Sequence, residues 1–141
     1  MLPSDRFEKA ITTFDAYNLN DPHQELIDGQ MVSKELVYAQ RMSQRLSNFL
    51  PTAPEYLQLA ARCQHIGRWE VPRESYAMDK KGYLQWRTFL KSHHAKLAEQ
   101  ILISCRYDTE TIEKVNNKNQ KIISAEIVTK TKNKIINILR D

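Results

Sequence analysis

Residues 55–73 read EYLQLAARCQHIGRWEVPR, and this stretch decides the fold. Apolar side chains spaced three and four residues apart predict a helix over residues 55–66 with one buried face. Gly67 suits the left-handed residue that commonly follows a helix end. Residues 68–81 show no helical period, so we expect an ordered loop after this helix.

The same helical spacing recurs on both sides of this stretch. It predicts further helices over residues 4–17, 33–50, 82–104 and 108–115. The chain has only 3 glycines and 5 prolines among 141 residues, which favours helices joined by few loops over a sandwich or barrel. Residues 18–29 are predicted to be a polar connector, and no strand is expected. The sequence therefore predicts an all-α fold, a single compact domain of about five helices over residues 1–115.

The last segment, residues 116–141, differs in composition and is predicted to lie outside that domain as a weak helix or a frayed tail. It is rich in Lys, Asn and Ile, and residues 114–141 carry a net charge of +5. Residues 62–96 also carry +5, whereas the body over residues 1–113 sums to −1. The basic pI of about 9.1 therefore comes from the tail, and the local charge in the middle of the chain indicates a solvated face or an anion-binding surface.

Composition also limits the class of protein. With 41% hydrophobic and 27% charged residues, the chain is ordinary for a soluble globular protein. No apolar run is long enough for a membrane span, and the first residues are too acidic for a signal peptide. Cys63 and Cys105 form no Cys-x-x-Cys motif and are predicted to be buried thiols. We therefore expect a cytoplasmic protein with no membrane partner.

Three histidines and one glutamate are the candidate metal ligands. His65 is expected at the end of a helix beside the loop, and His93 and His94 lie within a later helix. Neighbouring helical residues point about 100° apart, so at most one of these two is expected to face His65. Glu35 could complete a mixed nitrogen and oxygen site suited to Mn, Fe, Ni or Zn. The alternative is that His65 is a capping or core residue and that Glu35 only stabilises its helix dipole.

Arginines and aromatic residues accompany these histidines. A guanidinium group matches phosphate bidentately, so four arginines are candidate substrate ligands. They are Arg62, Arg68, Arg73 and Arg87. Trp69 and Trp86 are candidates for contact with the same substrate, with packing as the alternative. The sequence has no glycine-rich phosphate loop, no Gly-x-Ser-x-Gly and no His-Glu-x-x-His, so a metal-dependent phosphate-ester site is the chemistry these residues favour.

Several strings in the sequence resemble one family. They are Phe14-Asp15-Ala16, Glu35-Leu36-x-Tyr38-Ala39-x-Arg41-Met42, Gln64-His65-Ile66-x-Arg68-Trp69-x-x-Pro72-Arg73, Gly82-Tyr83-x-x-Trp86-Arg87 and His93-His94-Ala95. On these strings the chain resembles the family called domain of unknown function 4202 over about residues 5–115.

That family is in turn similar to the HD-domain metal-dependent phosphohydrolases, which are all helical. The resemblance implies that Gln64-His65 stands where those enzymes have a His-Asp pair, and that Glu35 stands near their first histidine. It also implies that His93 or His94 is an auxiliary histidine. Gln64 departs from the pattern because an amide is a poor metal ligand, and Glu126 is the only acid that matches the late aspartate of those enzymes.

Together, the residues and the resemblance predict an HD-like helical protein that binds one divalent metal ion and hydrolyses a small phosphate-bearing substrate. Two alternatives remain at this stage. One is a non-catalytic module in which the arginines and aromatic residues bind RNA or a nucleotide. The other is a truncated and inactive member of the family.

Overall fold

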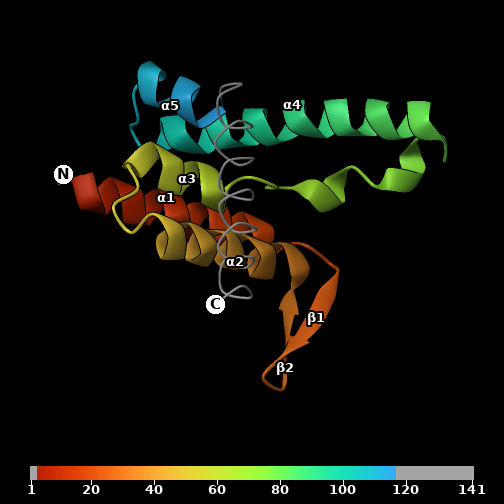
Figure 1. Cartoon of the computed structure of the whole chain (residues 1–141), viewed down its shortest axis with the longest axis horizontal. Helices are drawn as coiled ribbons and strands as arrows, with labels where there is room; N and C mark the ends of the chain where they lie inside the picture. The colour runs from red at the N-terminus through yellow and green to blue at the C-terminus, as the bar shows by residue number, and fades with distance from the viewer. Residues whose placement is uncertain (1–2, 117–141) are drawn as a thin grey trace, which may run out of the picture.

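Five α-helices and one small hairpin make up the computed structural model, which describes residues 3–116 (Figure 1). The helices are α1 (Pro3–Asn18), α2 (Lys34–Phe49), α3 (Glu55–Arg62), α4 (Lys80–Ser104) and α5 (Thr109–Asn116). The predicted all-α fold is confirmed, and each predicted helix is present. The separate basic segment predicted over residues 116–141 lies, from residue 117 on, outside the described residues. Within residues 3–116, no helix has both the length and the apolar character needed to cross a membrane.

The main core lies where α1, α3, α4 and α5 meet. Its fully buried side chains come from these helices and from the turn after α3: Phe14, Leu59, Ile66, Leu102 and Val115. Each helix has apolar residues on one face, and burying one such side chain stabilises the fold by about 1.5–3 kcal/mol. A second cluster, built on Leu46 and Leu57, packs α2 against α3. Together these contacts fix the relative positions of α2, α3 and α4.

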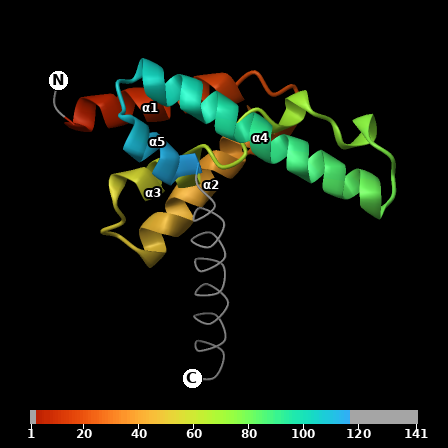
Figure 2. The same ribbon diagram turned by 90° about the horizontal axis from the view of Figure 1, so that it is seen from above.

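The amino-terminal half of α4 extends beyond the other helices, as both ribbon views show (Figures 1 and 2). The chain between α3 and α4 runs beside it and forms two short 3₁₀ helices, η1 (Arg68–Glu70) and η2 (Arg73–Ser75). Trp86 is buried with Val71 and Leu90 under this loop, and its indole N–H donates a 2.7 Å hydrogen bond to the Val71 carbonyl. We call this region, residues 68–92, the α4 arm.

A hairpin that the sequence analysis missed lies before α2. Strands β1 (Gln24–Ile27) and β2 (Gln30–Ser33) pair antiparallel, so the prediction of a polar connector with no strand is wrong. Asp28 and Gly29 have φ angles of 48° and 82°, as a type I′ turn requires at both central positions. The Asp28-Gly29 pair is the sequence signal that could have predicted this hairpin. The flanking strands are only four residues long and largely exposed, so they show little hydrophobic alternation.

The end of α3 also differs from the prediction. The helix ends at Arg62 rather than Ile66, because residues 63–67 form tight turns in which the Ile66 N–H donates to the Cys63 carbonyl at 3.2 Å. Gly67 has a φ of 70°, which confirms the left-handed conformation expected there. His65 therefore lies in a turn outside the helix, where the backbone brings it toward α2 and α4.

Candidate functional site

Five side chains from four parts of the chain form a cluster between the start of α2 and the middle of α4. They are Glu35, Tyr38, His65, Arg68 and His94. The Tyr38 and His65 rings stack, with centroids 4.3 Å apart and planes 7° apart, and the His65 and His94 centroids are 5.6 Å apart. Burial raises the pKa values of both Glu35 and Tyr38, and the nearby Arg68 charge opposes that rise in both. We call this group the Glu35–His94 cluster.

Two buried polar atoms of this cluster lack hydrogen-bond partners among the described residues. They are Oε2 of Glu35 and Nδ1 of His65. The Glu35 residue is only 9% exposed, so water gives its carboxyl little compensation. An unpaired buried polar atom costs about 1–3 kcal/mol, and most such atoms in native proteins are paired. The two together in one cluster make it a candidate place for a ligand that supplies the missing contacts.

Burial controls the protonation of the cluster. It raises the pKa of Glu35 to about 7, although the Arg68 charge acts in the opposite direction. Burial is also the main cause that lowers the pKa of His65 to about 3 and that of His94 to about 4. Both imidazoles are therefore neutral at pH 7, and Glu35 exchanges its proton near that pH.

One hydrogen bond fixes the tautomer of His94. Its Nδ1 lies 2.7 Å from the carbonyl oxygen of Ile66, and because a carbonyl can only accept, Nδ1 carries the proton. In the neutral ring the other nitrogen, Nε2, is then a hydrogen-bond acceptor. A backbone carbonyl that orients an imidazole in this way is typical of histidines that bind a metal or accept a proton.

Asp21 was missed by the sequence analysis, and it anchors Glu35. The Asp21 carboxylate, which is almost completely buried, accepts a 3.0 Å hydrogen bond from the Glu35 backbone N–H at the start of α2. Its other oxygen accepts from the backbone N–H and from Nδ1 of His23, both at 2.9 Å. Because Asp21 and Glu35 are separated by the whole hairpin, no local spacing in the sequence indicates this contact.

Three of the four predicted substrate arginines lie in the α4 arm. The Arg68 guanidinium carbon lies 5.5 Å from the centroid of the Trp86 ring, and that of Arg73 lies 5.9 Å from it. Arg73 and Arg87 lie 5.8 Å and 5.9 Å from the centroid of the Tyr83 ring. Arg68 and Arg87 also both lower the pKa of His65, so they act on the Glu35–His94 cluster from two different elements.

Arg62 lies elsewhere and has a structural partner. Its guanidinium donates two hydrogen bonds to the Asp15 carboxylate, at 2.9 Å and 2.6 Å, and so connects α3 to α1. The pair is largely buried, with side-chain exposures of 16% and 22%. The contacts of Arg62 therefore support a structural role in joining α3 to α1, and they do not support its predicted role as a substrate ligand.

We expect an Arg62→Gln variant to lose about 1.5–3 kcal/mol of unfolding free energy, because the paired Asp15 carboxylate would remain without its charged donor. Urea unfolding at pH 7 would measure this loss. The matched control is Arg41→Gln, which removes a longer and more exposed pair with Glu25 at 3.7 Å and should cost at most about 1 kcal/mol. Equal losses for the two variants would contradict the assignment.

His93 and Trp69 belong to a second network beside the cluster. Glu70 Oε1 accepts a 2.6 Å hydrogen bond from the Tyr17 hydroxyl and a 3.1 Å hydrogen bond from Nε2 of His93. Trp69 packs against Tyr17, with ring centroids 5.8 Å apart. The expectation that only one of the two adjacent histidines faces His65 is confirmed, since His94 stacks with it and His93 binds Glu70. For Trp69 and the buried Trp86, packing is the role that the contacts support.

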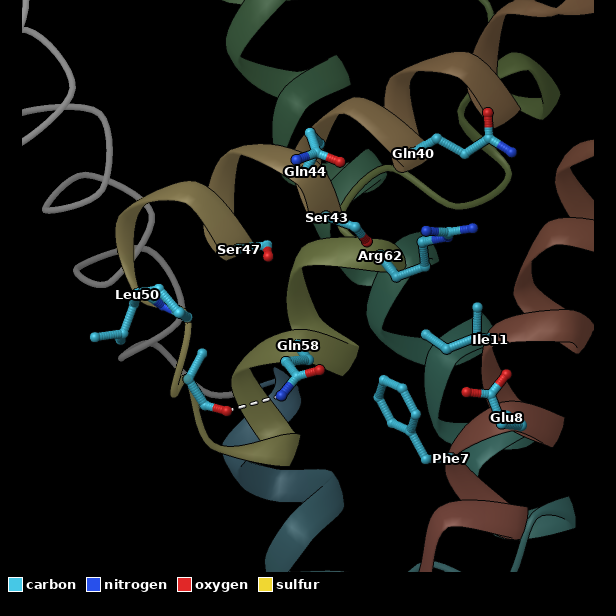
Figure 3. Close-up of a pocket in the computed structure, with 12 residues that line it drawn as sticks. Phe7, Glu8, Ile11, Gln40, Ser43, Gln44, Ser47, Leu50, Gln58 and Arg62 are labelled. Carbon is cyan, nitrogen blue, oxygen red and sulfur yellow. Dashed lines mark hydrogen bonds between the residues drawn. The ribbon is translucent and has the colours of Figure 1, made fainter.

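A separate groove of about 440 Å³ lies between α1, α2 and α3 (Figure 3). Its walls carry amide and hydroxyl side chains from α2, such as Gln40 and Ser43, opposite Phe7 and Ile11 from α1. Gln58 in this groove donates to the Ala53 carbonyl at 2.8 Å. No member of the Glu35–His94 cluster lines this groove, so it is separate from the candidate site.

The predicted metal ligands are only partly brought together. His65 and His94 lie side by side and Glu35 is in the same cluster, whereas His93 is bound to Glu70. Among residues 3–116, no group of three or more His, Cys, Asp or Glu side chains is arranged to hold a metal ion. The donors of the cluster therefore fit a divalent metal in kind, but their spacing does not form a complete site. Glu126, the acid matched to the late aspartate, lies outside the described residues.

The fold and the cluster define a small helical protein in which a buried Glu and two partly buried, neutral His side chains lie beside arginines. The chain matches the model of the family described as Domain of unknown function (DUF4202) over residues 8–137, and it belongs to that family. The match continues past residue 115, where the predicted domain ended, and includes most of the basic segment. No curated protein and no solved structure matches the chain.

Proposed function

We propose that the Glu35–His94 cluster binds a small phosphate-bearing substrate and that the protein is a phosphohydrolase. One observation carries the proposal: the two unpartnered buried atoms, Glu35 Oε2 and His65 Nδ1, lie in the same cluster as Arg68. A phosphoryl group presents several strong acceptor oxygens, and a guanidinium is the side chain that best matches them. A phosphate oxygen can accept from either unpaired atom when that atom carries a proton, and can donate to it when the oxygen itself is protonated.

The residues of the chain suit this chemistry in distinct ways. Arg68 would hold the phosphoryl oxygens and offset their developing negative charge. Glu35, whose pKa burial raises to about 7, is suited to release or take up a proton near neutral pH. His65, whose pKa is lowered to about 3, remains neutral and therefore acts through hydrogen bonding, not through its own protonation.

The proposed cofactor is one divalent metal ion, with Mn, Fe, Ni and Zn as candidates. When bound, such an ion polarises a phosphoryl oxygen and lowers the pKa of a coordinated water molecule. Glu35, His65 and the unprotonated Nε2 of His94 are the donors that would contribute to holding it. The described residues do not form a complete three-ligand group, so metal analysis of the purified protein decides whether the ion is bound.

Phosphate binding and metal content test the proposal directly. We expect inorganic phosphate to bind the wild-type protein in calorimetry, and Arg68→Gln to weaken that binding by about tenfold through loss of charged hydrogen bonds. Arg41→Gln is the matched control and should leave the affinity unchanged. Protein purified without a histidine tag should contain about one metal ion per chain, should hydrolyse p-nitrophenyl phosphate, and should lose both properties on His65→Ala.

A second candidate function is a non-catalytic module that binds RNA or a nucleotide. The observation that favours it is the set of arginines placed against Trp86 and the partly exposed Tyr83. Such a module would bind a short single-stranded RNA with steep salt dependence, and it would hydrolyse nothing. Metal-free protein with that behaviour and no affinity for inorganic phosphate would overturn the first proposal. A folded protein with neither property would match the inactive alternative.

A further inference from the structure

Three arginines and two aromatic rings of the α4 arm form one connected array. Trp86 is shared by Arg68 and Arg73, and Tyr83 is shared by Arg73 and Arg87. Each guanidinium carbon lies between 5.5 Å and 5.9 Å from the centroid of its ring. Because consecutive arginines share a ring, their charges are held close together along the arm. We call these five residues the arginine–aromatic array.

The array contains three positive charges and no carboxylate. Among residues 3–116, none of its arginines lies within ion-pair distance of an Asp or Glu side chain, whereas Arg6, Arg41 and Arg62 each have such a partner. Like charges on one surface repel one another, and cation–π contacts compensate only about 0.5–2 kcal/mol each. An anionic partner with more than one charged group would offset this repulsion.

The three arginines differ in how many of their N–H donors remain available. Arg73 donates to the backbone carbonyls of Tyr76, Ala77 and Asp79, so it closes the loop before α4 and contributes mainly charge. Arg87 makes one long hydrogen bond, 3.4 Å, to the Tyr83 hydroxyl. It is exposed on α4, and its charge acts on His65 together with that of Arg68. Arg68 and Arg87 lie at the two ends of the array, joined through Trp86, Arg73 and Tyr83, so a ligand with more than one anionic group can contact both.

We infer that the substrate carries at least two linked phosphoryl groups, one held by Arg68 at the Glu35–His94 cluster and the next held by Arg87 on α4. This inference rests on the proposed function and adds the substrate class to it. One phosphoryl group satisfies one bidentate guanidinium and the cluster. The second phosphoryl group gives Arg87 a partner and offsets the charge of Arg73, which a monophosphate would leave uncompensated.

Calorimetry with inorganic phosphate, pyrophosphate and tripolyphosphate at constant ionic strength tests the inference. For the wild-type protein we expect pyrophosphate to bind at least about tenfold more tightly than phosphate. Arg87→Gln should weaken pyrophosphate binding by more than it weakens phosphate binding, and so should reduce this difference. Arg68→Gln should weaken both ligands, and Arg41→Gln should weaken neither. Arg87→Lys, which keeps the charge but loses the bidentate geometry, should give an intermediate pyrophosphate affinity.

The outcomes separate this inference from the proposed function. If wild-type protein binds none of the three anions, the proposed function is wrong. If it binds phosphate and pyrophosphate equally well, the site exists and only the two-phosphoryl inference is wrong. A loss of pyrophosphate affinity in Arg41→Gln as large as that in Arg87→Gln would show a general charge effect and would overturn the inference. Tighter binding of single-stranded RNA than of tripolyphosphate, with a steep salt dependence, would also overturn it.

Discussion

A Glu35→Gln variant should be more stable than the wild-type protein at pH 8.5 and should show no such gain at pH 4.5. Burial raises the pKa of Glu35 from 4.5 to about 7 in the folded protein. Between these values the folded protein keeps a proton that the unfolded chain releases. The stability from the protonated carboxyl is thus complete below pH 4.5 and is lost as the pH rises through 7. The shift corresponds to about 3 kcal/mol, and glutamine does not titrate.

Thermal melting at several pH values measures this effect. His65 and His94 act in the opposite direction, because their pKa values are lowered from 6.5 to about 3 and about 4. Their stabilising effect is complete above pH 6.5 and is lost as the pH falls through 4 and 3. Both proteins contain these histidines, so the difference between wild type and variant isolates Glu35. Glu99→Gln, at an exposed position of α4, is the control. A difference that does not change with pH would show that Glu35 does not ionise in a buried site.

The helices and the central pair of histidines were predictable from the sequence for a local reason. Helical periodicity is a property of neighbouring residues, and the 100° rotation between adjacent helical residues already restricted His93 and His94 to different faces. The structure shows that His94, and not His93, is directed toward His65. That outcome depends on how α4 packs over the turn after α3. The sequence also predicts that Glu35 lies in the first turn of α2. Glu35 comes close to His65 only because the fold packs α2 against α3.

The contacts that the sequence did not reveal are those between distant residues. Arg62 was grouped with the other arginines by charge, although its partner Asp15 lies 47 positions earlier in the chain. Asp21 holds the start of α2 from beyond the hairpin. Such pairings follow from tertiary packing, and no spacing rule within one segment specifies them. The same reasoning explains why Arg62 pairs with a carboxylate whereas, among residues 3–116, the other arginines of that basic segment do not.

Gly82→Ala should strongly destabilise the α4 arm, although replacing glycine by alanine in a helix normally stabilises it by about 0.5–1 kcal/mol. A Cβ atom at Gly82 would overlap the carbonyl oxygen of Ala77 and would lie 2.7 Å from its carbonyl carbon and 2.9 Å from its nitrogen. These atoms belong to the backbone, so no side-chain rotation relieves the overlap. The loop must move away from α4, at a cost of about 1–3 kcal/mol or more.

The movement would reach the proposed substrate contacts through the loop itself. The Asp79 carboxylate accepts a 2.7 Å hydrogen bond from the Gly82 N–H, and Arg73 donates to the carbonyls of Ala77 and Asp79. Displacing the loop breaks this arrangement and removes Arg73 from between Trp86 and Tyr83. We therefore expect Gly82→Ala to lower the unfolding free energy in urea and to weaken pyrophosphate binding more than phosphate binding. Gln85→Ala, an exposed position of the same helix, should change neither. A Gly82→Ala protein as stable as the wild type would show that the loop does not pack so closely on α4.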